Sequence, residues 1–258
     1  MSLYAINGKE PVAAWIPSQD TAGNGTTTLN DLVGSNHGTL TNMDVATDWV
    51  LDGGKYALDF VGNNAHIETN YQGITGSSAR TCAFWMRSSG SGTIISWGTT
   101  AGASAFEVRV QNNAIALAIA GAFIVGTTNV VDDVWHHVAV SYSAAGQLAD
   151  AKIYVDGSLD SISSQLGPTI ILNTGTGSLR IARNIVGNVF YSDLIDDTRI
   201  WNVPLDATDV AALYAAGRGG LLNVAAGFTG IRGVNNRLGT SAPAGFTGIR
   251  GISRRLGT

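Results

Sequence analysis

The sequence predicts an all-β fold in which two antiparallel sheets pack as a sandwich. Apolar residues alternate with other residues in short runs at 56–60, 82–86 and 106–110, and a period of two is typical of strands with one buried face. The 33 glycines and 5 prolines among 258 residues favour strands joined by tight turns over helices. A chain of this length can bury one large β core.

The later strands follow the same pattern in order along the chain. Alternating apolar residues recur at 115–119, 138–142, 153–155, 179–181 and 198–200. Turn signals such as Gly53-Gly54 and Asn112-Asn113 separate the runs at the intervals of a sandwich. Cys82 is the only cysteine, so an intrachain disulfide is excluded and we expect a buried thiol.

One short helix is predicted near residue 206. Asp206 can cap its N-terminus and Asp209 lies in the favourable first turn, while Gly217 can end it. Val210 and Leu213 share one face with Tyr214, and we expect this face to close one side of the sandwich.

The last 33 residues contain two copies of a repeat. Residues 226–240 and 244–258 match at 12 of 15 positions with a period of 18. We therefore divide the chain into an N-terminal lead (1–10), a β domain (11–217) and a Gly/Arg-rich arm (218–258). Glycine recurs every third residue, but each run has only three triplets and no proline, which disfavours a collagen helix.

The arm differs in charge from the rest of the chain. Residues 1–209 contain nine basic and 19 acidic residues, a balance of −10, whereas the six residues charged after that point are all arginines. Such a division predicts that the arm binds an acidic partner. We expect apolar anchors and arginines to make the contacts, and two copies to add avidity. The predicted contact residues are Phe228, Ile231, Arg232, Arg237, Phe246, Ile249, Arg250 and Arg255.

Five motifs together resemble a known family. They are YALDFVG at 56–62, TCAFWM at 81–86, WHHVAV at 135–140, IYVDG at 153–157 and IDDTRIWN at 195–202. In this order they resemble the laminin-G-like jelly rolls of the concanavalin A-like lectin and glucanase superfamily, over roughly residues 11–217. The resemblance implies a jelly roll in which one sheet is often concave and binds glycans or proteins. It does not imply a single function.

Calcium is the one ion that the resemblance brings into consideration. Asp59, Asp196 and Asp197 occupy motif positions that could contribute oxygen ligands, although Val61 stands where many relatives have a second acid. The alternative is that Asp59 and Asp197 accept hydrogen bonds in turns or pair with Arg199. No cofactor is expected to be required.

The sequence gives little support for catalysis. Glycan hydrolysis needs two carboxylates flanking the bond, but Glu68 and Glu107 stand alone and only three Glu occur. For a glycan site, Trp97 with its Ser and Gly neighbours is the predicted stacking residue.

We therefore predict a non-catalytic structural and recognition protein. The jelly roll would face outward and bind glycans, and the arm would anchor it to a large assembly, either a capsid or copies of itself, as an oligomer. A phage virion component, made in host cytoplasm, is the interpretation we favour because there is no secretory pattern and no apolar run of membrane-spanning length. A cell-surface or secreted lectin and a glycan-active enzyme are the alternatives. Nucleic acid is disfavoured as a partner because the body's charge of −10 opposes a phosphate backbone.

Overall fold

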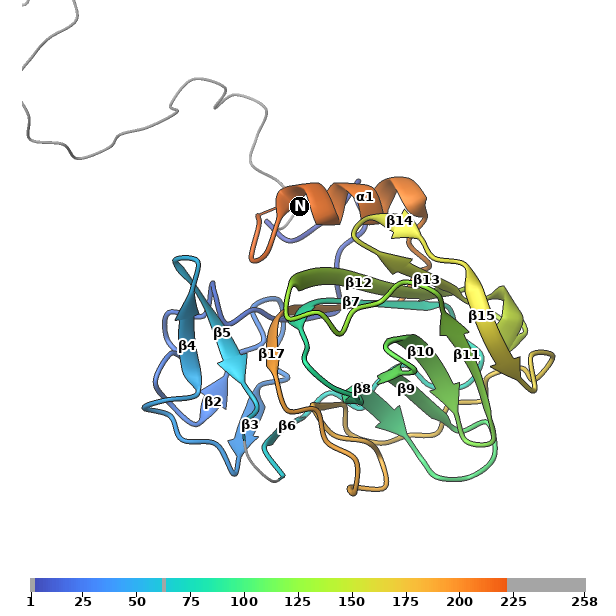
Figure 1. Ribbon diagram of the computed structural model, residues 1–258, viewed down its shortest axis with the longest axis horizontal. Helices are drawn as coiled ribbons and strands as arrows, with labels where there is room; N and C mark the ends of the chain where they lie inside the picture. The colour runs from blue at the N-terminus through green and yellow to red at the C-terminus, as the bar shows by residue number, and fades with distance from the viewer. Residues whose placement is uncertain (1–2, 62–63, 222–258) are drawn as a thin grey trace, which may run out of the picture. The chain divides into compact units, whose positions relative to one another are not determined.

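The computed structural model describes residues 3–61 and 64–221. These residues belong to the first of two units of the chain, Met1–Val224, and the second unit is Ala225–Thr258. The first unit consists mainly of two antiparallel sheets (Figure 1). This arrangement confirms the predicted antiparallel sandwich.

The eight-stranded sheet is built around β7 and β17. Its order is β14 (Ser158–Leu159), β13 (Lys152–Val155), β12 (Trp135–Tyr142), β7 (Arg80–Arg87), β17 (Leu194–Trp201), β5 (Lys55–Asp59) and β4 (Trp49–Asp52). The short strand β1 (Ala13–Trp15) also pairs with β17. Because β7 lies between strands from distant parts of the chain, it aligns Trp85 with His137 on one side and with Asp196 on the other.

The nine-stranded sheet holds the remaining strands. Its order is β15 (Ile162–Leu166), β11 (Ala122–Gly126), β10 (Ala114–Ile119), β9 (Ala105–Gln111), β8 (Gly92–Gly98), β16 (Arg180–Ile181), β6 (His66–Thr69), β3 (Gly38–Thr41) and β2 (Thr28–Leu29). A short 3₁₀ helix, η1 (Leu148–Asp150), precedes β13.

The core lies between the two sheets and follows the predicted alternation. Phe84 and Met86 of β7 and Phe106 and Val108 of β9 are all fully buried in one apolar cluster. Cys82 is buried in the same cluster, as predicted, and burial raises the pKa of its thiol to about 12.

The helix α1 (Ala207–Ala216) packs on the outer face of the eight-stranded sheet (Figure 1). The Asp206 carboxylate accepts the backbone N–H groups of Thr208 and Asp209, and Gly217 ends the helix with a φ of 75°. Val210 and Leu213 are buried against the sheet. The predicted helix and the burial of Val210 and Leu213 are confirmed, whereas Tyr214 is 41% exposed and stacks on Trp85.

Segments at both ends of the β domain are tied to the same face. Near the N-terminus, Asn7 and Lys9 both donate to the Asp209 carboxylate of the helix. After the helix, the Gly219 N–H donates to Asp197 Oδ2 at 2.9 Å and the Gly220 carbonyl accepts from Arg199 Nη2 at 2.9 Å. Residues 218–220, which the sequence pattern assigned to the arm, therefore belong structurally to the sandwich.

Candidate functional site

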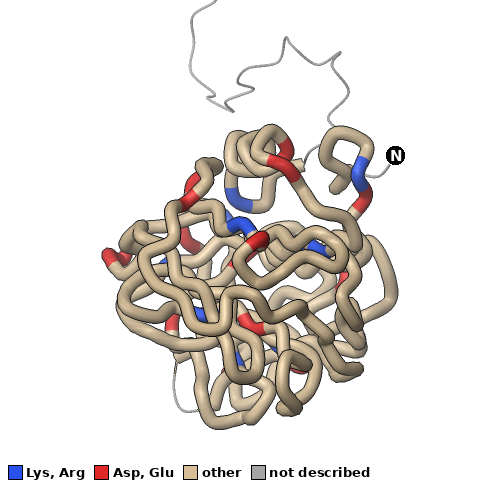
Figure 2. The backbone as a smooth tube through the Cα atoms, turned by 90° about the vertical axis from the view of Figure 1, so that its right-hand side faces the viewer, with Lys and Arg blue, Asp and Glu red and all other residues tan. Residues whose placement is uncertain are grey.

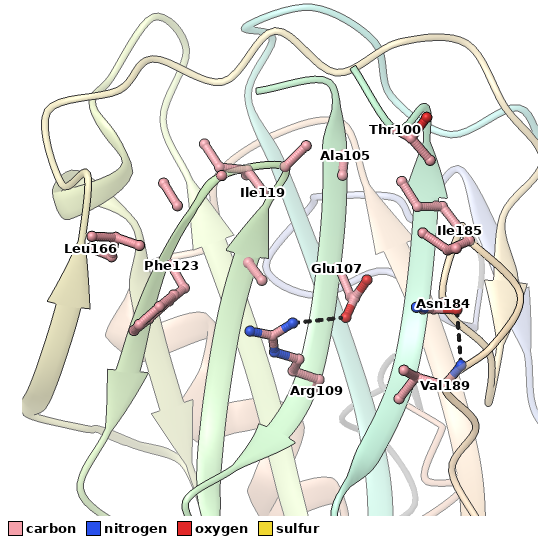
Figure 3. Close-up of a pocket in the computed structure, with 15 residues that line it drawn as sticks. Thr100, Ala105, Glu107, Arg109, Ile119, Phe123, Leu166, Asn184, Ile185 and Val189 are labelled. Atoms are coloured by element: carbon pink, nitrogen blue, oxygen red, sulfur yellow. Dashed lines mark hydrogen bonds and ion pairs between the residues drawn. The ribbon is translucent and has the colours of Figure 1, made fainter. Parts of the chain in front are cut away.

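A pocket of about 380 Å³ opens on the outer face of the nine-stranded sheet. Its floor comes from β9, β10 and β11, and one wall comes from the connection between β16 and β17 (Figure 3). This volume lies within the range of small-molecule sites in proteins. The lining residues are Thr100, Ala105, Glu107, Arg109, Ala118, Ile119, Ala120, Gly121, Ala122, Phe123, Leu166, Asn184, Ile185, Val186 and Val189.

Small outward side chains on two adjacent strands create the depth of the pocket. In β10 the residues Ile115, Leu117 and Ile119 enter the core, so the alternate alanines face the other way; of these, Ala118 lines the pocket, while Ala114 and Ala116 are buried beside Val125. Ala105 of β9 is likewise small and lines the pocket. The alternation that fills the core thus leaves space on the opposite face.

The loop from Asn184 to Val189 forms a fixed wall of the pocket. The Asn184 Oδ1 atom accepts the backbone N–H groups of Gly187, Asn188 and Val189 at 2.8, 3.0 and 3.1 Å. These bonds hold Val186 and Val189 in place, although the two side chains are 61% and 43% exposed. Exposed apolar groups held on a hydrogen-bonded loop are typical of a ligand contact surface.

One acidic and one basic side chain provide the charge on the pocket floor. The Arg109 guanidinium donates through Nη1 to Glu107 Oε1 at 3.4 Å, and the Thr93 hydroxyl donates to the same oxygen at 3.0 Å. Arg109 Nε also donates to Gln111 Oε1 at 3.0 Å. Figure 3 shows the Glu107–Arg109 pair between Phe123 on one side and Val189 on the other. The pocket therefore presents an adjacent acceptor and donor between apolar surfaces.

A second pocket, of about 460 Å³, lies at the strands β13 to β15. Its lining carboxylates, Asp150 and Asp160, are already engaged, and Asp150 Oδ2 accepts the Gln147 N–H at 2.7 Å. Asp160 accepts the N–H and hydroxyl groups of both Thr127 and Thr128. Burial opposes ionisation of Asp160, but these bonds hold its pKa below the usual value. We interpret these contacts as the anchoring of a turn.

Buried charges gather on the outer face of the eight-stranded sheet, beneath residues 218–220. Arg199 forms a two-point ion pair with Asp197, at 2.5 Å from Nε and 3.0 Å from Nη2. The Arg218 guanidinium lies 4.2 Å from the Trp135 ring centroid and 3.9 Å from Asp196 Oδ2. Burial, together with the neighbouring Asp197 charge, raises the pKa of Asp196 to about 7. Figure 2 shows charged positions of both signs distributed over the rest of the body.

The structure corrects the predicted calcium site. Asp197 forms an ion pair with Arg199, which confirms the alternative interpretation of that residue. The charged side chains that influence the pKa of Asp59 are Asp48, Asp193 and Arg87. Within residues 3–61 and 64–221, no three His, Cys, Asp or Glu side chains are grouped to hold a metal ion. Asp59, Asp196 and Asp197 therefore do not form one ligand set.

The predicted glycan contact at Trp97 is wrong. Trp97 lies on β8 and is fully buried in the core, where its ring stacks on Phe106 with the centroids 4.2 Å apart. Its indole N–H donates to the Ile74 carbonyl at 3.0 Å. Because the ring faces the other sheet, a sugar cannot reach it.

The predicted contact residues of the arm, from Phe228 to Arg255, lie outside the described residues. The pocket residues Glu107, Arg109, Asn184 and Val186 were not predicted as a site. The available signal was weak: Ala118 is small and alternates with the core residues of β10.

The family is identified by a match over more than half of the chain. A family model described as the concanavalin A-like lectin/glucanases superfamily matches residues 61–211. The chain belongs to this superfamily. The family assignment confirms the resemblance and, with the two antiparallel sheets, the jelly-roll fold. No curated protein sequence matches the chain.

Solved structures with low sequence identity share this jelly-roll fold. Domain 4 of AbnA, a GH43 extracellular arabinanase from Geobacillus stearothermophilus, in complex with arabinotriose, has a TM-score of 0.60 and 16% identity, with 80% of this chain and 98% of that chain covered. The binding domain of Paraclostridial Mosquitocidal Protein 1 has a TM-score of 0.56 and 12% identity, with coverage of 79% and 51%.

A botulinum neurotoxin type C structure, from a protein whose cell entry depends on interaction with two ganglioside molecules, has a TM-score of 0.56 and 15% identity, with coverage of 82% and 52%. The chain thus spans about half the length of these toxin domains.

Among the described residues, no helix is both long and apolar enough to cross a membrane.

Proposed function

We propose that this chain is a non-catalytic glycan-binding protein and that the glycan occupies the pocket on the nine-stranded sheet. The observation that carries this proposal is the pocket itself, where a preformed apolar wall meets an adjacent donor and acceptor. Sugars present apolar C–H faces and hydroxyl groups together, so they need both kinds of surface.

The structural neighbours support a glycan as ligand. The arabinanase domain is in complex with arabinotriose, and the neurotoxin depends on ganglioside molecules for cell entry. Both share the fold of this chain at low sequence identity, so they support a glycan as the class of ligand. The position of the site is proposed from the geometry of the pocket.

The pocket also supports a binding role over hydrolysis. Its lining contains one carboxylate, Glu107, which is paired with Arg109. Glycoside hydrolysis requires two carboxyl groups about 5 to 10 Å apart. With its single carboxylate engaged, the pocket supplies neither a free general acid nor a nucleophile.

We further propose that the C-terminal arm anchors the jelly roll to a large assembly, as a decoration or fibre component of a phage virion. The support is the duplicated repeat at 226–240 and 244–258 and its charge, which is opposite to that of residues 1–209. The partner is a capsid or copies of this chain, and assembly follows synthesis in host cytoplasm. A cell-surface or secreted lectin is the alternative.

A glycan array with the full-length protein tests the pocket. We expect the native protein to bind a subset of glycans and the Ala118→Phe variant, which fills the floor, to lose that binding while remaining folded by circular dichroism. The matched control is Ala144→Phe, at an exposed position that does not line the pocket. Unchanged binding by Ala118→Phe would place the glycan elsewhere.

Light scattering over a range of salt concentrations tests the arm. We expect oligomers from the full-length chain that weaken with salt, and monomers from a chain that ends at Gly220, because attraction between unlike charges is screened. If both are monomers, self-assembly through the arm is excluded, and affinity capture on residues 221–258 is then used to seek a capsid partner. Intact glycan binding by the truncated chain is expected in either case.

A further inference from the structure

We infer that the C-terminal arm of one copy of this chain docks on a second copy, in the edge pocket of about 460 Å³ at the strands β13 to β15. This inference rests on the proposed function, because it names the partner and the binding surface of the proposed arm contact. It depends on three features: an apolar surface around the edge pocket, an unprotected sheet edge beside it, and a repeat whose residues match both.

Exposed apolar side chains are concentrated around the edge pocket. Of the 12 large apolar side chains that are exposed among the described residues, five lie between residues 159 and 171. Leu159 and Ile162 line the pocket and are 59% and 39% exposed. Ile170 lies beside it, because its carbonyl accepts the N–H of Leu148 at 2.8 Å and the rest of η1 lines the pocket. An exposed apolar surface of this kind is typical of a site that another molecule covers.

The strand β15 leaves an unprotected sheet edge beside the pocket. It is the end strand of the nine-stranded sheet, and β11 is the only described strand that pairs with it. All five of its residues are exposed, and its sequence, ISSQL, contains neither proline nor charge, which commonly protect edge strands. The other end strands are shorter or charged, since β2 and β14 have two residues each and β4 includes Asp52. A peptide segment can therefore add to β15 as a further strand.

The repeats of the arm have residues that match this surface. Both contain the sequence AGFTGIRG, at 226–233 and 244–251. A segment that adds to a sheet edge is extended, so residues two apart share a face. The phenylalanine, the middle glycine and the arginine would then lie together on the side that faces the pocket. Neither repeat contains proline, so the backbone N–H groups needed for strand pairing are all present.

The charge of the pocket also favours the arm as its occupant. The lining contains two carboxylates, Asp150 and Asp160, and one ammonium group, Lys152. Asp150 is exposed and accepts the Gln147 N–H at 2.7 Å. Because a carboxylate can accept several hydrogen bonds, Asp150 can also accept from an arginine. The arm contains no acidic residue, so no like charge opposes its approach to this carboxylate.

The start of the arm and the edge pocket lie at different parts of the sandwich. Gly219 donates to Asp197 of β17 at 2.9 Å, and Arg218 donates to the Asp52 carbonyl of β4. Figure 1 shows β4 on the side of the sandwich away from β15. The strands β7, β12 and β13 separate β17 from β14, and α1 packs over them. An arm and a pocket at separate positions make a head-to-tail contact, in which each copy binds the next.

The length of the arm allows its two repeats to serve two neighbours. Phe228 and Phe246 are 18 residues apart, a length of chain that can span at most about 60 Å. A compact domain of this size is roughly 45 Å across. One arm can therefore reach the edge pockets of two other copies, which gives the second repeat a use that docking within one copy would not.

Photochemical cross-linking from the arm of the full-length protein tests the inference. Benzoylphenylalanine replaces Phe228 in an unlabelled preparation, which is mixed with an equal amount of isotope-labelled native protein and irradiated. Mass spectrometry then identifies the cross-linked peptides. We expect residue 228 to be joined to residues 149–171, with labelled and unlabelled partners in similar amounts, because the second copy is drawn from both preparations.

The other outcomes contradict the inference in different ways. Cross-links to residues 149–171 of unlabelled protein alone would place the arm on its own copy. Cross-links to labelled protein at other residues would leave assembly through the arm standing and reject the edge pocket. If no labelled cross-link forms and the full-length chain is a monomer, this inference is wrong, whereas affinity capture of a capsid partner and the glycan array still decide the proposed function.

A pair of leucine variants of the full-length chain tests the surface independently. Leu159 of β14 and Leu51 of β4 are 59% and 62% exposed, and they lie at the two opposite edges of the eight-stranded sheet. Leu159→Arg places a cation in the pocket, where it repels the arginines of the arm. We expect the concentration at which the oligomers half dissociate to rise about tenfold or more. Leu51→Arg is the matched control and should leave it unchanged. Equal effects of the two variants, with both folded by circular dichroism, would reject the edge pocket as the docking site.

Discussion

The outer faces of the two sheets are used in different ways. The helix α1 and residues 218–220 lie on the outer face of the eight-stranded sheet, whereas the corresponding face of the nine-stranded sheet opens into a pocket. One face is covered by the helix and by residues 218–220. The other retains apolar groups and a charged pair at which a ligand can bind.

The same side-chain types have different environments on the two faces. Arg199 and Asp197, under residues 218–220, are 3% and 6% exposed, whereas in the pocket Arg109 is 32% exposed and its partner Glu107 is 10% exposed. A buried charge depends strongly on its partner, while an exposed one is solvated by water. The comparison teaches that charges on the covered face stabilise the fold and charges on the open face are available for recognition.

The largest expected difference concerns these two arginines. Arg199→Met leaves the Asp197 carboxylate buried without its partner and should lower the free energy of unfolding by about 3–5 kcal/mol. Arg109→Met should lower it by about 1–2 kcal/mol, because Glu107 is only 10% exposed but keeps the hydrogen bond from Thr93. Urea denaturation measures both, and similar losses for the two variants would contradict the distinction between the faces.

Two leucines give the next largest difference. Leu213 of α1 is 5% exposed, and Leu166 at the pocket is 55% exposed. Leu213→Ala should cost about 2–4 kcal/mol because it leaves a cavity between the helix and the sheet, whereas Leu166→Ala should cost about 0.5 kcal/mol. Thermal unfolding of both variants checks this, and a large loss in Leu166→Ala would show that the open face is structural.

The pH dependence of stability should reveal the buried Asp196. Its pKa is raised to about 7, above the value of about 3.9 in an unfolded chain, so the folded state retains a proton that the unfolded state releases. This contribution to stability is present below pH 4 and is lost as the pH rises toward 7. Between pH 5 and pH 7, the free energy of unfolding of Asp196→Asn should therefore fall by about 1–2 kcal/mol less than that of the native protein. Parallel curves of stability against pH would contradict this assignment.

The smallest effect on stability is expected at the pocket wall. Val186 is 61% exposed, so Val186→Ser should change the free energy of unfolding by no more than about 0.5 kcal/mol. Its affinity for the glycan found on the array should nevertheless fall severalfold. Val134→Ser is the control, because Val134 is 54% exposed and does not line the pocket; it should change neither quantity. An equal loss of affinity in both variants would show that Val186 does not contact the glycan.

The buried face of the central strands could be predicted from sequence, and the pocket could not. The alternation at Phe106 and Val108 and the cap at Asp206 depend on neighbours along the chain, and both are confirmed. The pocket requires Asn184 to approach Glu107 across a long separation in sequence, which no local pattern specifies. The prediction of Trp97 as a glycan contact was wrong, although Trp97 follows Ile95 by two residues and both side chains are buried in the core.

The metal prediction was wrong because it treated adjacent carboxylates as ligands without their cationic neighbours. Asp197 and Arg199 are two residues apart, and the φ of 56° at Asp197 interrupts the regular pairing of β17 where their side chains meet. The sequence offered this pairing as an alternative. It could not show that Arg218 also lies near Asp196.

Hydrogen exchange measured with and without the glycan identified on the array tests the central claim most directly, since it reports on both faces at once. With saturating glycan, we predict slower amide exchange at residues 105–109, 118–123 and 184–189 and no change at residues 207–220. Protection at residues 207–220 with none around the pocket would contradict the assignment of recognition to the open face.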